Sequence, residues 1–130
     1  MQDALFFVEI MVKGKIFYCT KMNTYAYRIG HKNLNWNKNM VYDRMRCAAE
    51  IMNISKEYQL AHLHYLMCKN LLFCFKNLLW RVEPSVKSRV IEAIKTIKII
   101  DFRLLRHKYP EDKIRISPWK YIFSAIFGKL

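Results

Sequence analysis

A short run near the start of the chain, MNTYAYRIGHKN over Met22–Asn33, combines residue types that can do chemistry. Tyr25 and Tyr27 alternate with small residues, a pattern typical of a strand, and the glycine that follows indicates a turn. Arg28 and His31 flank that turn, and an arginine close to a histidine at a turn suggests a site. A solvated loop histidine and an arginine that braces the loop explain the same pattern. The sequence on either side is therefore needed to choose between a site and an ordinary loop.

The composition limits the classes of protein to which the chain can belong. Its 130 residues predict one domain or a piece of one, and a content of 53% hydrophobic and 15% aromatic residues excludes a disordered tail. Lysine and arginine number 23 against 10 acids, a net charge of +13, and the excess grows toward the C-terminus. Such a charge predicts an anionic partner: nucleic acid, acidic lipid headgroups or a phosphorylated substrate.

The cysteines and the charged residues indicate in which cellular compartment the protein is expected. None of the four cysteines forms a Cys-x-x-Cys pair or has a histidine at zinc-finger spacing. This favours reduced, mostly buried thiols in a cytoplasmic protein over disulfides or zinc. Asp3 and Glu9 argue against a signal peptide. The longest apolar run, residues 65–80, is interrupted by Lys69 and Lys76, so no transmembrane helix is predicted.

Apolar periodicity predicts helices along most of the chain and two short strands near its start. Ser55 is a suitable N-cap for a long central helix, and Pro84 suits the first position of the next one. In that next helix Val86, Val90 and Ile94 are expected to face inward. Helices are expected at residues 3–13, 39–52, 56–80, 85–108 and from Pro118 to the end, and strands at 16–20 and 24–29.

The order of features over residues 2–33 resembles the C-terminal part of family 2 glycosyltransferases of the GT-A fold. In that family an acid pair or Gln-Asp pair heads a helix, a strand follows, and a Tyr-x-Tyr-Arg segment leads into a loop that often carries a histidine. Here these features fall on Gln2-Asp3, Ile16–Thr20, Tyr25–Arg28 and His31. The fold class expected is therefore mostly α with a short β-hairpin-like element near the N-terminus. It would be the C-terminal fragment of an α/β GT-A enzyme (residues 1–38) with a helical extension (39–116 and 117–130).

The resemblance implies transfer of a sugar from a nucleotide-sugar donor to a glycan or lipid-linked acceptor in cell-surface polysaccharide synthesis. By the resemblance Asp3, next to Gln2, is the candidate general base that takes the acceptor's proton. Arg28 is the candidate for a phosphate or loop contact, and His31 for a contact to the divalent metal, Mg or Mn, of the full-length enzyme. Away from the family context, Asp3 is an acid suited to the first turn of a helix.

The chain also departs from the family. Its donor-binding half and metal-binding Asp-x-Asp have no counterpart in the sequence. We therefore expect a truncated gene or a mis-called start, with no activity and no cofactor for this chain alone.

The final stretch, SPWKYIFSAIFGKL, predicts an amphipathic helix capped by Ser117 and opened by Pro118. In one interpretation, the apolar face of this helix packs on the preceding helices. The other places that face in an anionic membrane surface, on the cytoplasmic side of the cell membrane, with Lys120 toward the headgroups. The membrane-facing residues would be Trp119, Ile122, Phe123, Ile126 and Phe127.

Two other classes of function remain open. A basic helical module with interleaved aromatic residues could bind nucleic acid, although no recognition helix or RNA-binding motif is present, so no specific nucleic acid is expected. A peripheral membrane or adaptor bundle without chemistry is the other alternative. Neither alternative requires the block from Gln2-Asp3 to His31, which therefore distinguishes them from the glycosyltransferase.

Overall fold

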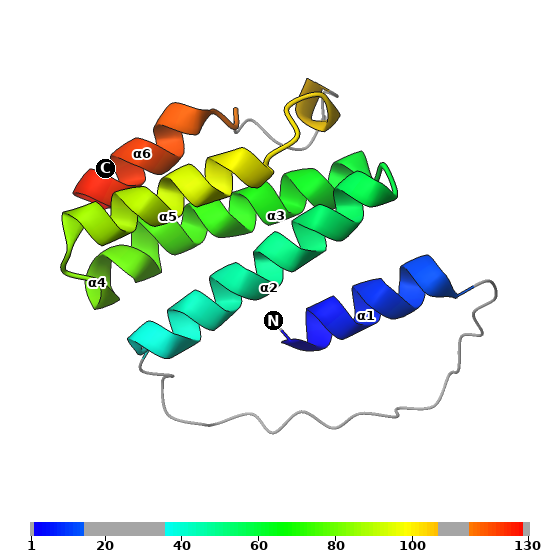
Figure 1. Cartoon of the computed structure of the whole chain (residues 1–130), viewed down its shortest axis with the longest axis horizontal. Coiled ribbons are helices and arrows are strands. Elements are labelled where there is room, and N and C mark those ends of the chain that lie inside the picture. Colours follow the sequence, from blue (N-terminus) through cyan, green and yellow to red (C-terminus); the bar gives the residue numbers. More distant parts are fainter. Residues whose placement is uncertain (1, 15–35, 107–114, 129–130) are drawn as a thin grey trace.

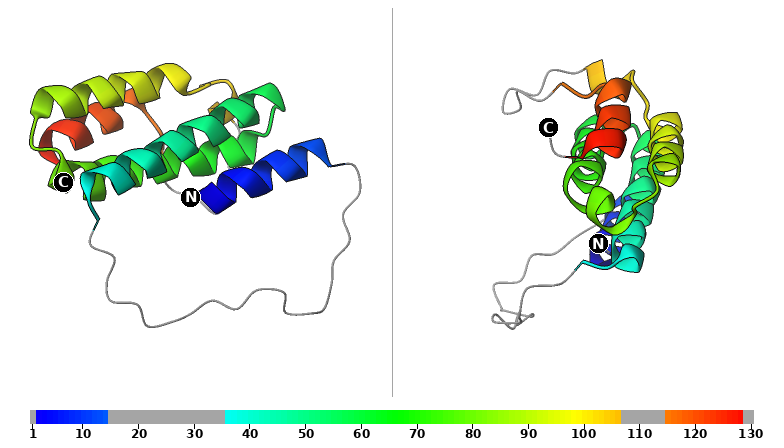
Figure 2. Two further views of the ribbon diagram at one scale, coloured as in Figure 1. Left: turned by 60° about the horizontal axis from the view of Figure 1, so that its bottom comes forward. Right: turned by 90° about the vertical axis from the view of Figure 1, so that its left-hand side faces the viewer.

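The computed structural model describes residues 2–14, 36–106 and 115–128. Figure 1 shows α2 and α3 side by side, α5 and α6 along one edge of the pair, and α1 against α2 at the opposite edge. α1 and α6 lie apart from each other in both views of Figure 2. The elements are α1 (Gln2–Lys13), α2 (Lys38–Glu57), α3 (Ala61–Phe73), the π-helix η1 (Cys74–Leu79), α4 (Trp80–Val82), α5 (Val86–Ile99), the 3₁₀ turn η2 (Leu104–Arg106) and α6 (Pro118–Phe127).

The expected fold class, an α/β GT-A fragment with a β-hairpin, is wrong. Every regular element of the described residues is a helix, and these residues hold no strand or sheet. The core forms where helical faces meet, and its apolar positions follow helical periodicity, as in other helix-on-helix layers. The two expected strands, residues 16–20 and 24–29, lie outside the described residues. The predicted fold class rested on a resemblance over residues 2–33 only, whereas the rest of the chain shows helical periodicity.

The break between α2 and α3 lies later than the sequence predicts. Asn37 caps α2, its side chain accepting a hydrogen bond of 2.9 Å from the amide of Met40. The helix continues through the predicted turn to Glu57, and the chain reverses at Gln59, whose φ of 56° is left-handed. Ser55, predicted as an N-cap, is instead buried in the last turn of α2. Its hydroxyl donates to the carbonyl oxygen of Met52 and contacts His64, so it does not cap the start of a helix.

The boundaries and the buried face of α5 also differ from prediction. Ser85 is the N-cap and accepts from the amide of Ser88 at 3.2 Å, so Pro84 precedes the cap. The helix ends at Ile99, well before residue 108. Its buried face carries Arg89, Ala93 and Thr96, whereas Val86 and Ile94 are exposed. The small residues Ala93 and Thr96 allow the neighbouring helices to approach closely, and Val90 is half-buried against the core, as predicted.

The core joins residues from α2, α3, η1, α5 and α6. Cys47, Cys68 and Cys74 are buried free thiols, which confirms the prediction for the described cysteines. Burial raises the pKa of Cys68 to about 12, so this thiol is unreactive at neutral pH. The buried apolar residues that pack together are Val41, Met45, Ala48, Met52, Cys68, Leu71, Leu72, Cys74, Phe75, Leu78, Leu79, Ala93, Ile100, Tyr121 and Ala125.

Candidate functional site

The described residues bring none of the predicted catalytic residues together. Asp3 is exposed in the first turn of α1, where an acid interacts favourably with the helix dipole. Gln2 is the first residue of the same helix. Arg28 and His31 lie outside the described residues. Within the described ranges, no group of three or more His, Cys, Asp or Glu side chains could hold a metal ion.

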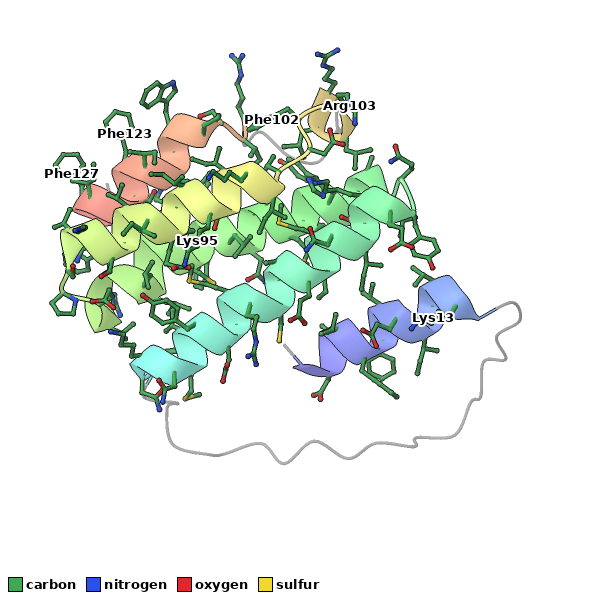
Figure 3. All side chains as sticks on the ribbon, viewed as in Figure 1. Lys13, Lys95, Phe102, Arg103, Phe123 and Phe127 are labelled. Atoms are coloured by element: carbon green, nitrogen blue, oxygen red, sulfur yellow. The ribbon has the colours of Figure 1, made fainter. Side chains whose placement is uncertain are left out.

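The outward side of α6 carries three exposed aromatic side chains. We call Trp119, Phe123 and Phe127 the aromatic ridge, because they follow one another at i, i+4 and i+8 along the helix. They are 67%, 47% and 55% exposed. Each ring centroid lies 6.4 Å from the next, so the rings form a continuous apolar strip. Figure 3 shows Phe123 and Phe127 pointing away from the rest of the protein.

The three residues of the aromatic ridge belong to the set that the sequence predicts to face a membrane. Ile122 and Ile126, from the same predicted face, are half-buried, and Ile122 packs against the core. Lys120 is exposed next to the ridge, and Arg115, also exposed, precedes α6. One side of the helix therefore packs inward, as the packing interpretation expects, and its aromatic side stays exposed.

Tyr121 fixes the rotation of α6 about its own axis. Its side chain is fully buried, and its hydroxyl donates a hydrogen bond of 2.6 Å to the carbonyl oxygen of Cys68 in α3. Its ring meets Phe75 edge to face, with 5.8 Å between centroids. Ser124 and Ala125 are buried on the same side of the helix. With this side held in the core, the aromatic ridge has to face outward.

Arg89 holds the C-terminal end of α6. This arginine is 5% exposed, and its guanidinium donates to four carbonyl oxygens. Two belong to the end of α6, Ala125 at 2.6 Å and Ile126 at 3.3 Å, and two to the chain after α4, Glu83 at 2.6 Å and Pro84 at 2.9 Å. Carbonyl groups at helix ends carry partial negative charge, which compensates a buried cation.

Sequence reasoning missed Arg89, because a single basic residue in a helix ordinarily faces solvent. The available signal was its position on one face with the small residues Ala93 and Thr96, which indicates close helix packing around it. The two pairs of carbonyl groups come from segments that only the folded chain brings together.

Gly128 ends α6 in a conformation that a larger residue would strain. Its φ is 72°, in the left-handed region that favours glycine. A Cβ at this position would lie 2.6 Å from Cγ of Trp80, so the indole ring covers the glycine directly. Pro118 is in the first turn of the helix, as predicted, but the side chain of Ser117 makes no capping hydrogen bond.

A second polar cluster joins the start of α2 to the connection between α4 and α5. The carboxylate of Glu83 contacts Lys38 Nζ at 2.5 Å and accepts from the Tyr42 hydroxyl at 3.2 Å and the Ser85 amide at 3.3 Å. The bond from Lys38 is the main reason why the pKa of Glu83 is lowered. Burial, and then the Glu83 carboxylate, raise the pKa of Tyr42 to about 12.

The cation-aromatic contacts of Arg44 bear on the nucleic-acid alternative. Its guanidinium lies 5.5 Å from the ring centroid of Trp36 and 5.9 Å from that of Phe73. Its Nε donates to the side-chain oxygen of Asn70 at 3.2 Å. The arginine and both rings are therefore already engaged with one another.

Comparisons with protein-family models, with curated proteins and with solved structures find no match for this chain. None of the helices in the described part of the chain combines the length and the apolar character needed to cross a bilayer.

Proposed function

We propose that this chain docks peripherally on anionic membrane surfaces through α6. The observation that carries the proposal is the aromatic ridge, Trp119, Phe123 and Phe127, on a helix whose opposite side is locked in the core. Large aromatic side chains in a continuous exposed strip are unusual on a surface that faces only water.

The chemistry of the ridge and its surroundings fits a lipid surface. Aromatic rings suit the boundary between headgroups and acyl chains. Arg115 and Lys120 are exposed near the ridge, and the whole chain carries a net charge of +13. Each basic residue close to an anionic surface contributes about 1 kcal/mol of attraction. Because α6 is already folded and held, it can dock without the entropy cost of forming a helix at the membrane.

Co-sedimentation with phosphatidylcholine vesicles, with and without phosphatidylserine, tests the proposal. Replacing Phe123 and Phe127 by serine should weaken binding to the anionic vesicles at least about tenfold, because burial of each ring contributes roughly 1.5–3 kcal/mol. The matched control replaces Phe6 and Phe7, which are also exposed but lie on α1 at the opposite edge of the molecule. This control should bind as the unchanged protein does.

Point substitutions are needed because removal of α6 would also take Tyr121 and Ala125 out of the core. Binding should fall as salt is raised from 0.1 to 0.5 M, since exposed charges are then screened. Equal binding by the ridge variant and the α1 variant would overturn the proposal, as would the absence of binding by the unchanged protein. Retention by nucleic acid instead of vesicles would favour the alternative function.

A second candidate role is sugar transfer, in which the chain acts as a helical portion of a glycosyltransferase on the cytoplasmic side of the membrane. The resemblance over residues 2–33 implies this role. The observation that favours it lies on α1: the carboxylate of Asp3 is accessible, and the apolar side chains of Phe6, Phe7 and Ile10 are exposed, where a further part of such an enzyme could cover them. Membrane docking would suit a lipid-linked acceptor.

Two measurements test the second role. Titration calorimetry with uridine and guanosine diphosphate sugars, with magnesium or manganese, should show no micromolar binding by this chain alone. In a protein that supplies the donor-binding half, Asp3→Asn should lower turnover by about 10²–10⁴-fold. Glu9→Gln, at the other acid of the same helix, is the matched control and should leave turnover nearly unchanged. Turnover of the Asp3→Asn variant within threefold of the parent would exclude Asp3 as the base.

A further inference from the structure

A fully buried histidine connects three segments of the fold. His64, near the start of α3, is 0% exposed. Its Nδ1 lies 2.8 Å from Oγ of Ser55 in the last part of α2. Its Nε2 lies 2.9 Å from the amide nitrogen of Asp101, which follows the end of α5. The Ser55 hydroxyl also lies 2.7 Å from the carbonyl oxygen of Met52.

These partners determine the protonation state of the ring. The Asp101 amide can only donate, so Nε2 has to accept and carries no proton. The ring proton is then on Nδ1 and is donated to Ser55 Oγ, whose own proton goes to the Met52 carbonyl. Every donor and acceptor of this group has a partner while His64 is neutral. A proton added to Nε2 would face the N–H of Asp101, and the two donors would repel one another.

The charged groups near His64 do not change this conclusion. Burial is the main reason why the pKa of His64 is lowered from its ordinary 6.5, and Lys56 on α2 lowers it further. The backbone carbonyl of Met52 and, to a smaller extent, the carboxylate of Asp101 raise the pKa, but less than burial lowers it. That carboxylate is already bound to Arg103, accepting from its amide at 2.9 Å, from Nε at 3.4 Å and from a terminal guanidinium nitrogen at 3.3 Å.

We propose that His64 is an acid-sensitive latch, which holds the connection between α5 and η2 closed while the ring is neutral and releases it when the ring is protonated. Release separates the Asp101 amide from Nε2 and lets the chain from Ile100 to Leu104 move away from α3. Ile100 and Leu104 are each 7% exposed in the closed state, so opening uncovers two apolar side chains. The latch does not depend on membrane docking.

The direction of the pH dependence follows from the neutral folded form. A histidine with a lowered pKa in the closed state contributes stability that is fully present above its ordinary pKa. That contribution is lost as the pH falls below about 6.5. At pH 5.5, one unit below the ordinary pKa, the open state gains up to about tenfold relative to the closed state.

Amide hydrogen exchange, followed by NMR on the full chain at pH 7.5 and 5.5, tests the latch. Exchange of the Asp101 amide, corrected for the intrinsic effect of pH, should rise by up to about tenfold at the lower pH. The reference is the Glu83 amide, which bonds to the Leu79 carbonyl at 2.9 Å and should show no such rise. His64→Gln keeps a neutral hydrogen-bonding side chain and should abolish the pH dependence at Asp101.

The comparison of two amides within the unchanged protein holds even if the variant fails to fold. A constant Asp101 rate across this pH range would overturn the proposal. So would an equal rise at Asp101 and Glu83, because it would mean general loss of stability instead of a local opening. The same rise in the His64→Gln variant would assign the effect to another group.

Discussion

The hydroxyl of Tyr121 and the carbonyl oxygen of Cys68, 53 residues apart, are joined by a hydrogen bond of 2.6 Å inside the core. This contact ties α6 to the middle of α3. It also determines which side of α6 faces the protein, and therefore that the aromatic ridge faces away from it. A surface feature of the terminal helix thus depends on one buried polar contact.

Tyr121→Phe removes the donor and leaves the ring in place. We expect a loss of about 1–1.5 kcal/mol in the free energy of unfolding, because the Cys68 carbonyl loses a buried partner. Urea denaturation followed by circular dichroism measures it. Tyr58→Phe, at an exposed tyrosine, is the control and should change stability by less than about 0.5 kcal/mol. Equal stability of the two variants would show that the hydroxyl contributes nothing.

Arg89→Lys should be far from conservative. An ammonium group cannot donate to both pairs of carbonyl oxygens, which the planar guanidinium reaches together. We expect a loss of about 2–4 kcal/mol in the free energy of unfolding, since buried acceptors are left unpaired. Amide exchange should increase first in α6. Arg81→Lys, at an exposed arginine, is the matched control and should have little effect. A small effect at position 89 would mean that water replaces the lost bonds.

Gly128→Ala should destabilise the end of α6 for two separable reasons. The backbone conformation alone, with φ 72° and ψ −136°, costs about 1–3 kcal/mol for alanine, and the new Cβ would meet the ring of Trp80. The same substitution in a Trp80→Ala background should retain only the first cost. Thermal unfolding of the four proteins forms a double-mutant cycle, and the difference between the two costs measures the steric contact. Strictly additive effects would rule out that contact.

Tyr42→Phe should make the protein less sensitive to alkali. The pKa of Tyr42 is about 12 in the folded protein, against an ordinary value of 10.0. The unfolded chain therefore loses this proton first, and stability falls as the pH rises through that interval. Urea denaturation at pH 9 and pH 11 should show a smaller decrease in the variant. Tyr121, whose pKa is also raised, contributes equally to both proteins. Identical decreases would contradict the assignment to Tyr42.

Much of the helical framework could be predicted from local rules. The helix of residues 3–13 coincides with α1 to within one residue at its start, and Pro118 lies in the first turn of α6 as expected. Helix formation and its end signals depend on neighbours three or four residues apart, which a sequence displays directly. The aromatic spacing of Trp119, Phe123 and Phe127 was visible for the same reason.

The sequence alone determined the basic charge, the helical periodicity and the aromatic strip of the terminal helix. Only the tertiary structure decided that Ser55 supports a buried histidine instead of starting a helix, that Arg89 faces inward on α5, and that the aromatic ridge stays outside. The first outcome depends on a partner 9 residues away in sequence, the second on partners up to 37 residues away, and the third on a contact between residues 53 apart. Periodicity identifies a face that can be buried, but the free energy of burial depends on what the rest of the chain brings against it.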